Sequence, residues 1–374
     1  MRHLRRSIFE GTRREPLPAL PGVPGGAVPA ISVERSAVAP VGYWAQIWHR
    51  LRKDHFALVC GAWLIVVFVV LFAGAPIVSH LVGHGPDEQF LRGADLSRKP
   101  VGPWTHVPIT FSLYGPVPPG TKHTLFVLGA DGPLGRDELV RLLYGGQVSL
   151  EIAIGATLIA VGLGLTLGMA AGYYGGWTDS VVSRITEFTM GFPVLLLLIA
   201  IGTTISDRFD FITFHGVLNR GVFSLAIVIG LITWFYPARI IRAEVLRLRE
   251  EEFVEAARMV GASNRRIMGR HLLPHLAAPI IVYSSLILAT NIVLEASISF
   301  LGLGVRLPTA TWGNMLSSNW GTLLNLSPGR SLYLAWEPSF WTSFMPVIAI
   351  GSTVLAFAGL GEGLRRAFDP RSIQ

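Results

Sequence analysis

Six long apolar runs constrain the fold of this 374-residue chain more than any other feature of its sequence. Each run is close to the roughly 20 residues that an α-helix needs to cross a bilayer. Lipid offers no hydrogen bonds to an open backbone, so we expect helices, and the short alternating stretches of a membrane β-barrel are absent from the sequence. The sequence therefore predicts an all-α membrane protein with six transmembrane helices, at about Phe56–Val78, Ser149–Tyr173, Phe188–Thr204, Val222–Ile240, Pro279–Leu301 and Ser343–Leu360.

Composition supports a membrane protein and argues against a nucleic-acid partner. Charged residues make up 15% of the chain, against roughly 25% in soluble domains. The formal net charge is +7, with 28 Arg and 3 Lys, but these residues lie mostly between the apolar runs. The preference of basic residues for the cytoplasmic side of a membrane accounts for such a pattern, so we expect no nucleic acid.

Sequence motifs for catalysis and cofactor binding are missing. The chain contains no phosphate-binding loop of the form G-x-x-x-x-G-K-[ST] and no Cys/His cluster with the spacing of metal ligands. Its single cysteine, Cys60, excludes an internal disulfide. We expect no catalytic residue, no metal and no bound cofactor on this chain.

The distribution of Arg and Lys predicts the topology. Three segments carry most of the positive charge: the tail before the first run, the loop 239–276 and the C-terminal end. They share one side of the membrane only if the number of spans is even, so six spans place both termini in the cytoplasm. We accordingly divide the chain into a partly disordered cytoplasmic tail (1–54) and a transmembrane domain (55–374), with an extracytoplasmic loop at 80–140 and a cytoplasmic loop at 239–276.

The cytoplasmic loop has the pattern of two surface helices. No Pro or Gly interrupts Arg239–Val260, which predicts one helix, and Gly261 is placed to end it in a left-handed conformation. Ser263 is placed to cap a second helix, and Pro274 to end or kink it. One face of the first helix would then present Phe253, Ala256, Ala257 and Val260. A solvated helix linking two spans is the alternative reading of this pattern.

The same loop resembles the EAA loop of ABC-importer membrane subunits, which docks into the ATPase. The residues that carry this resemblance, and that we expect to couple to an ATPase, are Glu255, Ala256, Ala257, Gly261, Ala262, Leu273 and Pro274. His271 departs from the general signature, which has Ile there. Further stretches resemble the C-type subunits of dipeptide, oligopeptide and nickel permeases: Gly135–Asp137, Arg141–Gly145, Gly175–Trp177, Arg184–Glu187, Leu294–Ser297, Phe300–Gly304, Trp312–Met315 and Gly361–Arg371. The resemblance covers about residues 40–374.

The resemblance implies the transmembrane domain of a type I ABC importer in a bacterial cytoplasmic membrane. It implies a heterodimer with a homologous B-type permease, two ATPase subunits that hold ATP and Mg²⁺, and an extracytoplasmic binding protein that delivers di- or oligopeptides. Nickel, another metal chelate or glutathione is the alternative substrate. An ion-coupled secondary transporter is a more remote alternative, because such proteins favour inverted repeats and none is visible.

Two further groups are candidates for function. Gly164, Gly168, Gly172 and Gly176 form an i,i+4 ladder that lets helices approach closely, either within the subunit or against its partner. Asn291, Glu295 and Ser299 are polar residues inside the fifth run, where a charge is costly; they either line the pathway or form a structural network. We read Leu139–Tyr144 as a separate interfacial helix, the outer-loop residues His80, His84, His106 and His123 as surface groups, and Trp104, Trp312, Trp320, Trp336 and Trp341 as anchors at the membrane edge.

Overall fold

Within the described chain, four helices are long and apolar enough to cross a membrane, and two bent helix pairs raise the number to six if each pair is one span. The computed structural model describes residues 43–94, 99–110, 115–201, 221–324 and 338–368, all within the unit Tyr43–Gln374. The four long helices confirm the first, second, fifth and sixth predicted spans, and each exceeds its predicted length. They run His55–Val82, Glu138–Tyr174, Asn264–Phe300 and Trp341–Phe368.

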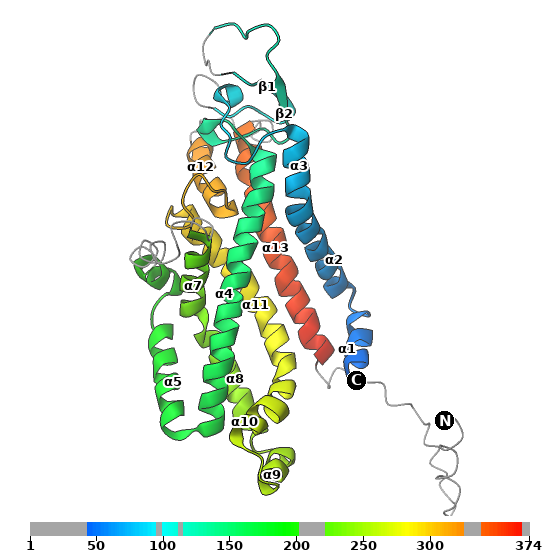
Figure 1. The fold of residues 1–374 in the computed structure, drawn as a ribbon, viewed down its shortest axis with the longest axis vertical. Coiled ribbons are helices and arrows are strands. Elements are labelled where there is room, and N and C mark those ends of the chain that lie inside the picture. Colours follow the sequence, from blue (N-terminus) through cyan, green and yellow to red (C-terminus); the bar gives the residue numbers. More distant parts are fainter. Residues whose placement is uncertain (1–42, 95–98, 111–114, 202–220, 325–337, 369–374) are drawn as a thin grey trace, which may run out of the picture. The chain divides into compact units, whose positions relative to one another are not determined.

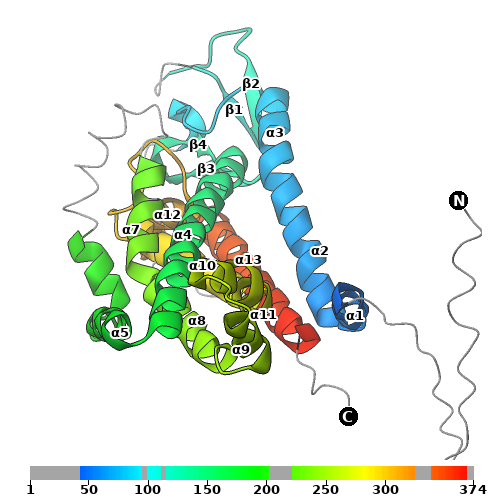
Figure 2. The same cartoon turned by 60° about the horizontal axis from the view of Figure 1, so that its bottom comes forward.

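The long helices pack side by side around α4, the longest (Figures 1 and 2). On one side α4 contacts α7 and α8; on the other it contacts α11, which packs on α13, and α13 packs on α2. The main helices are α1 (Tyr43–Leu51), α2 (His55–Val69), α3 (Ala75–Val82), α4 (Glu138–Tyr174), α5 (Gly176–Met190), α7 (Val222–Thr233), α8 (Phe235–Leu248), α9 (Glu252–Met259), α10 (Asn264–Arg266), α11 (Leu273–Phe300), α12 (Trp312–Leu324) and α13 (Pro338–Phe368). Two π-helical turns, Val70–Gly74 and Ile267–Leu272, join α2 to α3 and α10 to α11.

The third and fourth predicted spans are bent rather than straight. α5 and the helix Val194–Ile201 meet at 93°, because Pro193 cannot continue a helix. The last three residues of the predicted third span lie outside the described residues. α7 and α8 meet at 43°, and Pro237 lies just after the bend, where it removes a backbone donor from the first turn of α8.

A small cap (residues 84–137) occupies most of the predicted outer loop. It begins later than predicted because α3 runs to Val82, and it ends earlier because α4 begins at Glu138. Strand β1 (Thr105–Pro108) pairs antiparallel with β2 (His123–Phe126), and β3 (Ala130–Asp131) with β4 (Arg136–Asp137). A separate apolar cluster of Phe90, Val107, Phe126 and Ala130 fills the cap.

Two surface assignments made from the sequence, one in the cap and one at the start of α4, are wrong. His84 is buried between Thr124, whose Oγ lies 3.1 Å from its Nε2, and Asp137, whose Oδ2 lies 3.5 Å away. The ring edge also packs on Phe90. Leu139–Tyr144 is not a separate interfacial helix but the start of α4, and its Arg141 is fully buried. An amphipathic pattern does not reveal whether the polar face meets solvent or a buried ionic network, and here it meets the network.

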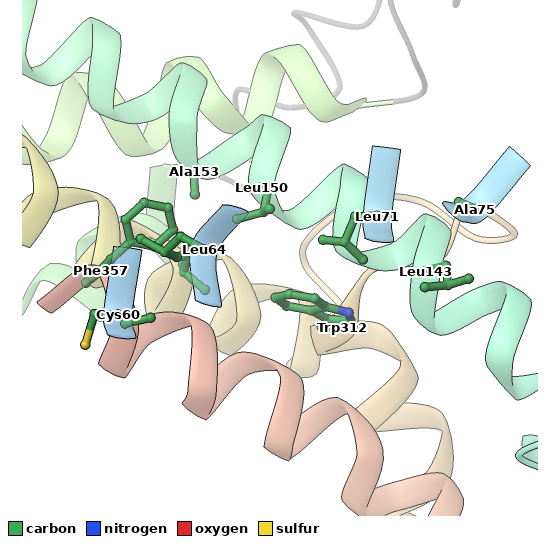
Figure 3. Close-up of a cluster of buried hydrophobic side chains, with 12 residues drawn as sticks. Cys60, Leu64, Leu71, Ala75, Leu143, Leu150, Ala153, Trp312 and Phe357 are labelled. Atoms are coloured by element: carbon green, nitrogen blue, oxygen red, sulfur yellow. The ribbon is translucent and has the colours of Figure 1, made fainter. Parts of the chain in front are cut away.

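The principal apolar core lies where α2, α4, α11, α12 and α13 converge, and Figure 3 shows its side chains. Trp312 is in this core, 2% exposed, so its predicted place at a membrane edge is wrong. Its indole N–H donates to the carbonyl of Leu142 at 2.9 Å, which satisfies the one polar atom that the ring buries. Gly146 makes room for the ring, because a Cβ there would lie 2.6 Å from an indole carbon. Trp336 lies outside the described residues.

Candidate functional site

The segment 239–276 contains the C-terminal part of α8, the short helix α9 and the beginning of the long helix that starts at Asn264, at one end of the long helices (Figure 1). The single helix predicted for Arg239–Val260 is wrong: α8 ends at Leu248, and α9 begins at Glu252 after an extended Glu251. The residues on both sides of the break are helical, so local helix propensity does not determine where α8 ends. Packing of α9 on its neighbours determines it. The turn brings α9 back so that Val254 is buried beside Leu248 and Ile267.

The helix-ending role of Gly261 is confirmed, since its φ is +81° and its N–H bonds to the carbonyl of Arg258. Ser263 stands at the start of α10 in an extended conformation, but its side chain makes no capping hydrogen bond. Pro274 does not end a helix. It lies inside the helix that is continuous from Asn264 to Phe300, just after the π-helical turn Ile267–Leu272 ends.

Helix α9 has one buried face and one exposed face. Phe253, Val254 and Ala257 pack inward on a cluster that includes Tyr173, Val245 and Leu272. The predicted shared face of Phe253, Ala256, Ala257 and Val260 is therefore divided, because only two of the four lie inward. The exposed side carries Glu252, Glu255, Ala256, Met259 and Val260.

Met259 and Val260 are 83% and 89% exposed, beyond the end of the apolar spans. They are adjacent in sequence, and both are exposed apolar side chains at the same turn. Glu255, Ala256, Gly261, Leu273 and Pro274 are also exposed, and Ala257 and Ala262 are half-buried. Glu255, Ala256, Gly261 and Ala262 thus lie around one turn, with Ala257 on its inner side, whereas Leu273 and Pro274 lie further along the chain at the start of α11.

Polar contacts with the last turn of α4 brace this projection. The hydroxyl of Tyr173 donates to Asn264 Oδ1 at 3.0 Å, and the guanidinium of Arg258 lies over the Tyr173 ring. Arg249 donates to the carbonyl of Gly172 at 3.2 Å. Because these contacts come from both sides of α9, the segment is held against α4 rather than hinged freely.

Asn291, Glu295 and Ser299 lie in the interior of the subunit, each no more than 1% exposed. Ser299 donates to Glu295 Oε1 at 2.7 Å, and Asn291 donates to Thr157 on α4 at 3.0 Å. Glu295 also lies beside Ser149 and Thr311. These contacts form a polar network between α4, α11 and the start of α12. This agrees with the second of the two readings made from the sequence, in which the three residues form a structural network. A role in lining the pathway stays a prediction.

Three of the four ladder glycines face α8. A Cβ on Gly164, Gly168 or Gly172 would lie 2.6 Å, 2.5 Å and 2.9 Å, respectively, from the nearest atom of α8. The ladder is therefore a seam within this subunit. Gly176 does not belong to it, because α4 ends at Tyr174 and a Cβ on Gly176 would meet nothing within 4 Å.

A buried ionic network at the other end of α4 was missed by the sequence reasoning. Asp131 accepts from Arg136 at 3.2 Å and pairs with Arg141 at 2.5 Å, and its second oxygen accepts from Asn319 of α12 at 2.9 Å. Asp137 caps α4 through the backbone N–H of Leu139 at 2.8 Å. Burial raises the pKa of Asp137, while its N–H bonds and His84 lower it. The sequence did contain a sign of this network: Arg136, Asp137 and Arg141 lie in stretches that resemble the permease family. That resemblance did not indicate that their side chains are buried.

In the part of the chain that the structure describes, no group of three or more His, Cys, Asp or Glu residues is placed to hold a metal ion.

The sequence matches two protein families. Residues 164–374 match the binding-protein-dependent transport system inner membrane component, and residues 42–100 match the N-terminal transmembrane domain of oligopeptide transport permease C. The dipeptide transport system permease protein of Alkalihalophilus pseudofirmus is 32% identical over 338 residues, covering 90% of this chain and 91% of that protein.

Two further relatives are similar. The glutathione transport system permease protein of Pectobacterium atrosepticum is 30% identical over 328 residues, 88% of this chain and 91% of its own length. A Brucella ovis protein provisionally named a peptide permease is 35% identical over 254 residues, 68% of this chain and 75% of its own length.

The chain belongs to the family of binding-protein-dependent transport system inner membrane components. It is a permease subunit of an ABC importer, with the type I transmembrane fold, in the inner membrane. Family membership implies a complex with a second permease, an ATPase and a binding protein.

Proposed function

We propose that this subunit forms, with a homologous B-type permease, the pathway for di- and oligopeptides delivered by an extracytoplasmic binding protein. Two ABC ATPase subunits, which hold ATP and Mg²⁺, drive the cycle. The names of the relatives support a short-peptide substrate, since one is a dipeptide permease and another a glutathione permease. Glutathione is itself a tripeptide, so it is the alternative that the similarity favours.

The observation that carries the coupling role is the projecting turn Met259–Gly261. Its two apolar side chains are almost fully exposed, while the opposite face of α9 is packed on the subunit. Methionine and valine at such a turn fit a groove on a partner, and methionine adapts to a groove that changes shape. We infer that the ATPase receives this turn and that its closure moves α9.

Bracing determines what such a movement would do. The residues that flank α9, Arg249 and Asn264, are hydrogen-bonded to Gly172 and Tyr173 in the last turn of α4. A push on the turn is therefore delivered to a transmembrane helix rather than absorbed by a loop. Coupling of this kind requires that the ATPase contact the turn differently in its two states.

The test substitutes Val260 in the complete complex reconstituted in vesicles with a binding protein. Val260→Asp places a charge in the contact, so we expect a normal amount of complex in the membrane but little substrate-stimulated ATP hydrolysis or uptake. Val260→Ile keeps the contact apolar and is the matched control, with activity near wild type. If Val260→Asp transports as well as Val260→Ile, the turn does not dock into the ATPase.

A second variant tests the shape of the turn. Gly261→Val forces a β-branched residue into φ of +81°, at a cost of about 1–3 kcal/mol. We expect the subunit to remain in the membrane but to lose the link between hydrolysis and uptake. Normal peptide uptake by this variant would count against the coupling role.

Substrate identity is tested separately with the wild-type complex. Dipeptides, oligopeptides and glutathione are offered with each candidate binding protein, and accumulation inside vesicles is measured. Accumulation of peptides other than glutathione supports the proposed substrate class, and accumulation of glutathione alone replaces it.

A further inference from the structure

An exposed tryptophan in the cap has a backbone conformation that residues with a side chain rarely adopt. Trp104, the residue before β1, has a φ of +58° and is 71% exposed. Among the residues that the structure describes, no acceptor meets its indole N–H. A left-handed conformation is costly for any residue with a Cβ, and such strain persists only where the surrounding structure imposes it.

Backbone contacts within the cap impose this conformation. The carbonyl oxygen of Val101 lies so close to Gly129 that a Cβ on that glycine would be 2.6 Å from it. The same carbonyl accepts the N–H of Ala130 at 3.1 Å, and the N–H of Trp104 bonds to the carbonyl of Val127 at 3.3 Å. The turn before β1 is therefore tied to the chain that follows β2, and the exposed indole is carried on a fixed backbone.

The turn lies well beyond the apolar part of the helices. The carbonyl of Gly129 accepts the N–H of Glu138, the first residue of α4, at 3.0 Å, so the turn is level with that end of α4. The run Ile152–Tyr174 contains no charged residue and is long enough to cross a bilayer. Glu138 precedes Ile152 by 14 residues, which is about 20 Å of helix. Trp104 accordingly stands in water rather than in lipid.

The side of the membrane follows from the charge distribution. Figure 1 shows β1 and β2 at the end of the long helices opposite α9. With the Arg-rich segment around α9 in the cytoplasm, as the positive-inside rule predicts, the cap is extracytoplasmic. The family to which the chain belongs is described as dependent on a binding protein, and this is the side on which the proposed function places that protein.

The surroundings of Trp104 define the chemistry of a partner. Residues 99–130 include Lys99 and Lys122 and contain no Asp or Glu. Lys122 and His123 are exposed on the hairpin that Trp104 begins. A fixed tryptophan loses little conformational freedom on binding, and tryptophan is prominent among the few residues that dominate protein interfaces. The matching surface has an apolar pocket with acidic groups near it.

We propose that Trp104 anchors the extracytoplasmic binding protein to the cap. The inference rests on the proposed function, in which such a protein delivers the substrate. The indole enters an apolar pocket of the binding protein, and an acceptor there receives its N–H. This contact replaces the membrane-edge role that the sequence predicts for Trp104.

Two substitutions separate the side chain from its strained backbone. Trp104→Gly removes the indole, and glycine adopts φ of +58° without strain, so lost binding would not reflect a distorted turn. Trp104→Phe keeps an aromatic ring on the same backbone. Trp177→Ala is the matched control, because Trp177 is 79% exposed but lies at the start of α5, beyond the last turn of α4.

The complete complex is placed in nanodiscs and titrated with the fluorescently labelled binding protein that stimulates ATP hydrolysis by the wild-type complex. We expect Trp104→Gly to weaken its binding at least about tenfold, as for a central interface residue. Trp104→Phe should lose less than Trp104→Gly, and Trp177→Ala should bind like wild type. Binding by Trp104→Gly as tight as that of wild type would overturn the proposal.

Two further readouts identify other roles for the indole. Loss of the second permease from the purified Trp104→Gly complex would assign the side chain to a contact between permeases. A lower thermal unfolding midpoint in nanodiscs with unchanged affinity for the binding protein would assign it to the membrane edge. Either result refutes the proposal. If no binding protein stimulates the wild-type complex, the proposed function fails and this inference fails with it, whereas stimulation with unaltered binding by Trp104→Gly refutes the inference alone.

Discussion

Gly168→Ala tests the seam between α4 and α8 most directly. The added Cβ would lie 2.5 Å from the carbonyl oxygen of Ala238 and 3.1 Å from its Cα. Both atoms belong to the backbone of α8, so no side chain can move aside and the helices themselves must separate. Overpacking of this kind costs about 1–3 kcal/mol.

Replacing glycine by alanine in a helix also has an intrinsic benefit, which must be subtracted. Gly162→Ala supplies this control on the same helix, because a Cβ there meets nothing within 4 Å. Alanine stabilises a helix by roughly 0.5–1 kcal/mol relative to glycine, and both variants receive this gain. The difference between them therefore isolates the cost of overpacking, about 1–3 kcal/mol.

The free energy of unfolding is measured by titrating the purified subunit in mild detergent with sodium dodecyl sulfate and following tryptophan fluorescence. Gly168→Ala should unfold at a lower concentration of the denaturing detergent than Gly162→Ala. If the two variants unfold together, within about 0.5 kcal/mol, α4 and α8 do not make the close contact described above.

The remaining predictions concern single polar contacts. The N–H of Ala57 first, and then Arg366, lower the pKa of Asp54. Its ionised form therefore stabilises the fold above its unfolded pKa of about 3.9. The difference in stability between wild type and Asp54→Asn should be constant near neutral pH and shrink below about pH 4 in acid titrations of unfolding. For the interhelical hydrogen bond from Asn291 to Thr157, a double-mutant cycle with Asn291→Leu and Thr157→Val should give a coupling free energy of about 0.6 kcal/mol. A coupling energy of zero would show that this hydrogen bond does not contribute to stability.

The spans were predictable because lipid imposes a single requirement on the sequence. A helix that crosses the membrane must be apolar over its length, and α2 and α4 meet this condition without help from neighbours. Bends were less visible. Pro193 signalled a break between α5 and the next helix, but its 93° angle depends on packing that no local pattern encodes.

The candidate coupling segment was located from its residues, but its faces were assigned incorrectly. Gly261 acts locally, because φ of +81° is a property of one residue, and the sequence shows it. The direction of Phe253 and Ala257 depends instead on where α8 stops. Both side chains pack on a cluster that includes Tyr173 of α4, which is distant in sequence from α9. Tertiary packing therefore decided what periodicity alone could not.

The cap shows the same limit more strongly. His84 and Asp131 are polar residues in a segment rich in Pro and Gly, and polar residues in such segments usually face water. They are buried because each has a polar partner: His84 lies beside the carboxylate of Asp137, and Asp131 forms an ion pair with Arg141. A charge pattern cannot distinguish a solvated group from a paired one without the partner's position.

These separate observations meet on α4. The helix has 37 residues and is therefore about 55 Å long. Its first turn is held to the cap through Asp137 and Arg141, and its last through Gly172 and Tyr173 to the braced segment around α9. Between them, the glycine seam joins it to α8 without a gap. Under the coupling role proposed above, this continuous helix, held at both ends and along its side, would carry a displacement of α9 toward the cap end. Had Leu139–Tyr144 been a separate helix, as the sequence suggested, that connection would be broken.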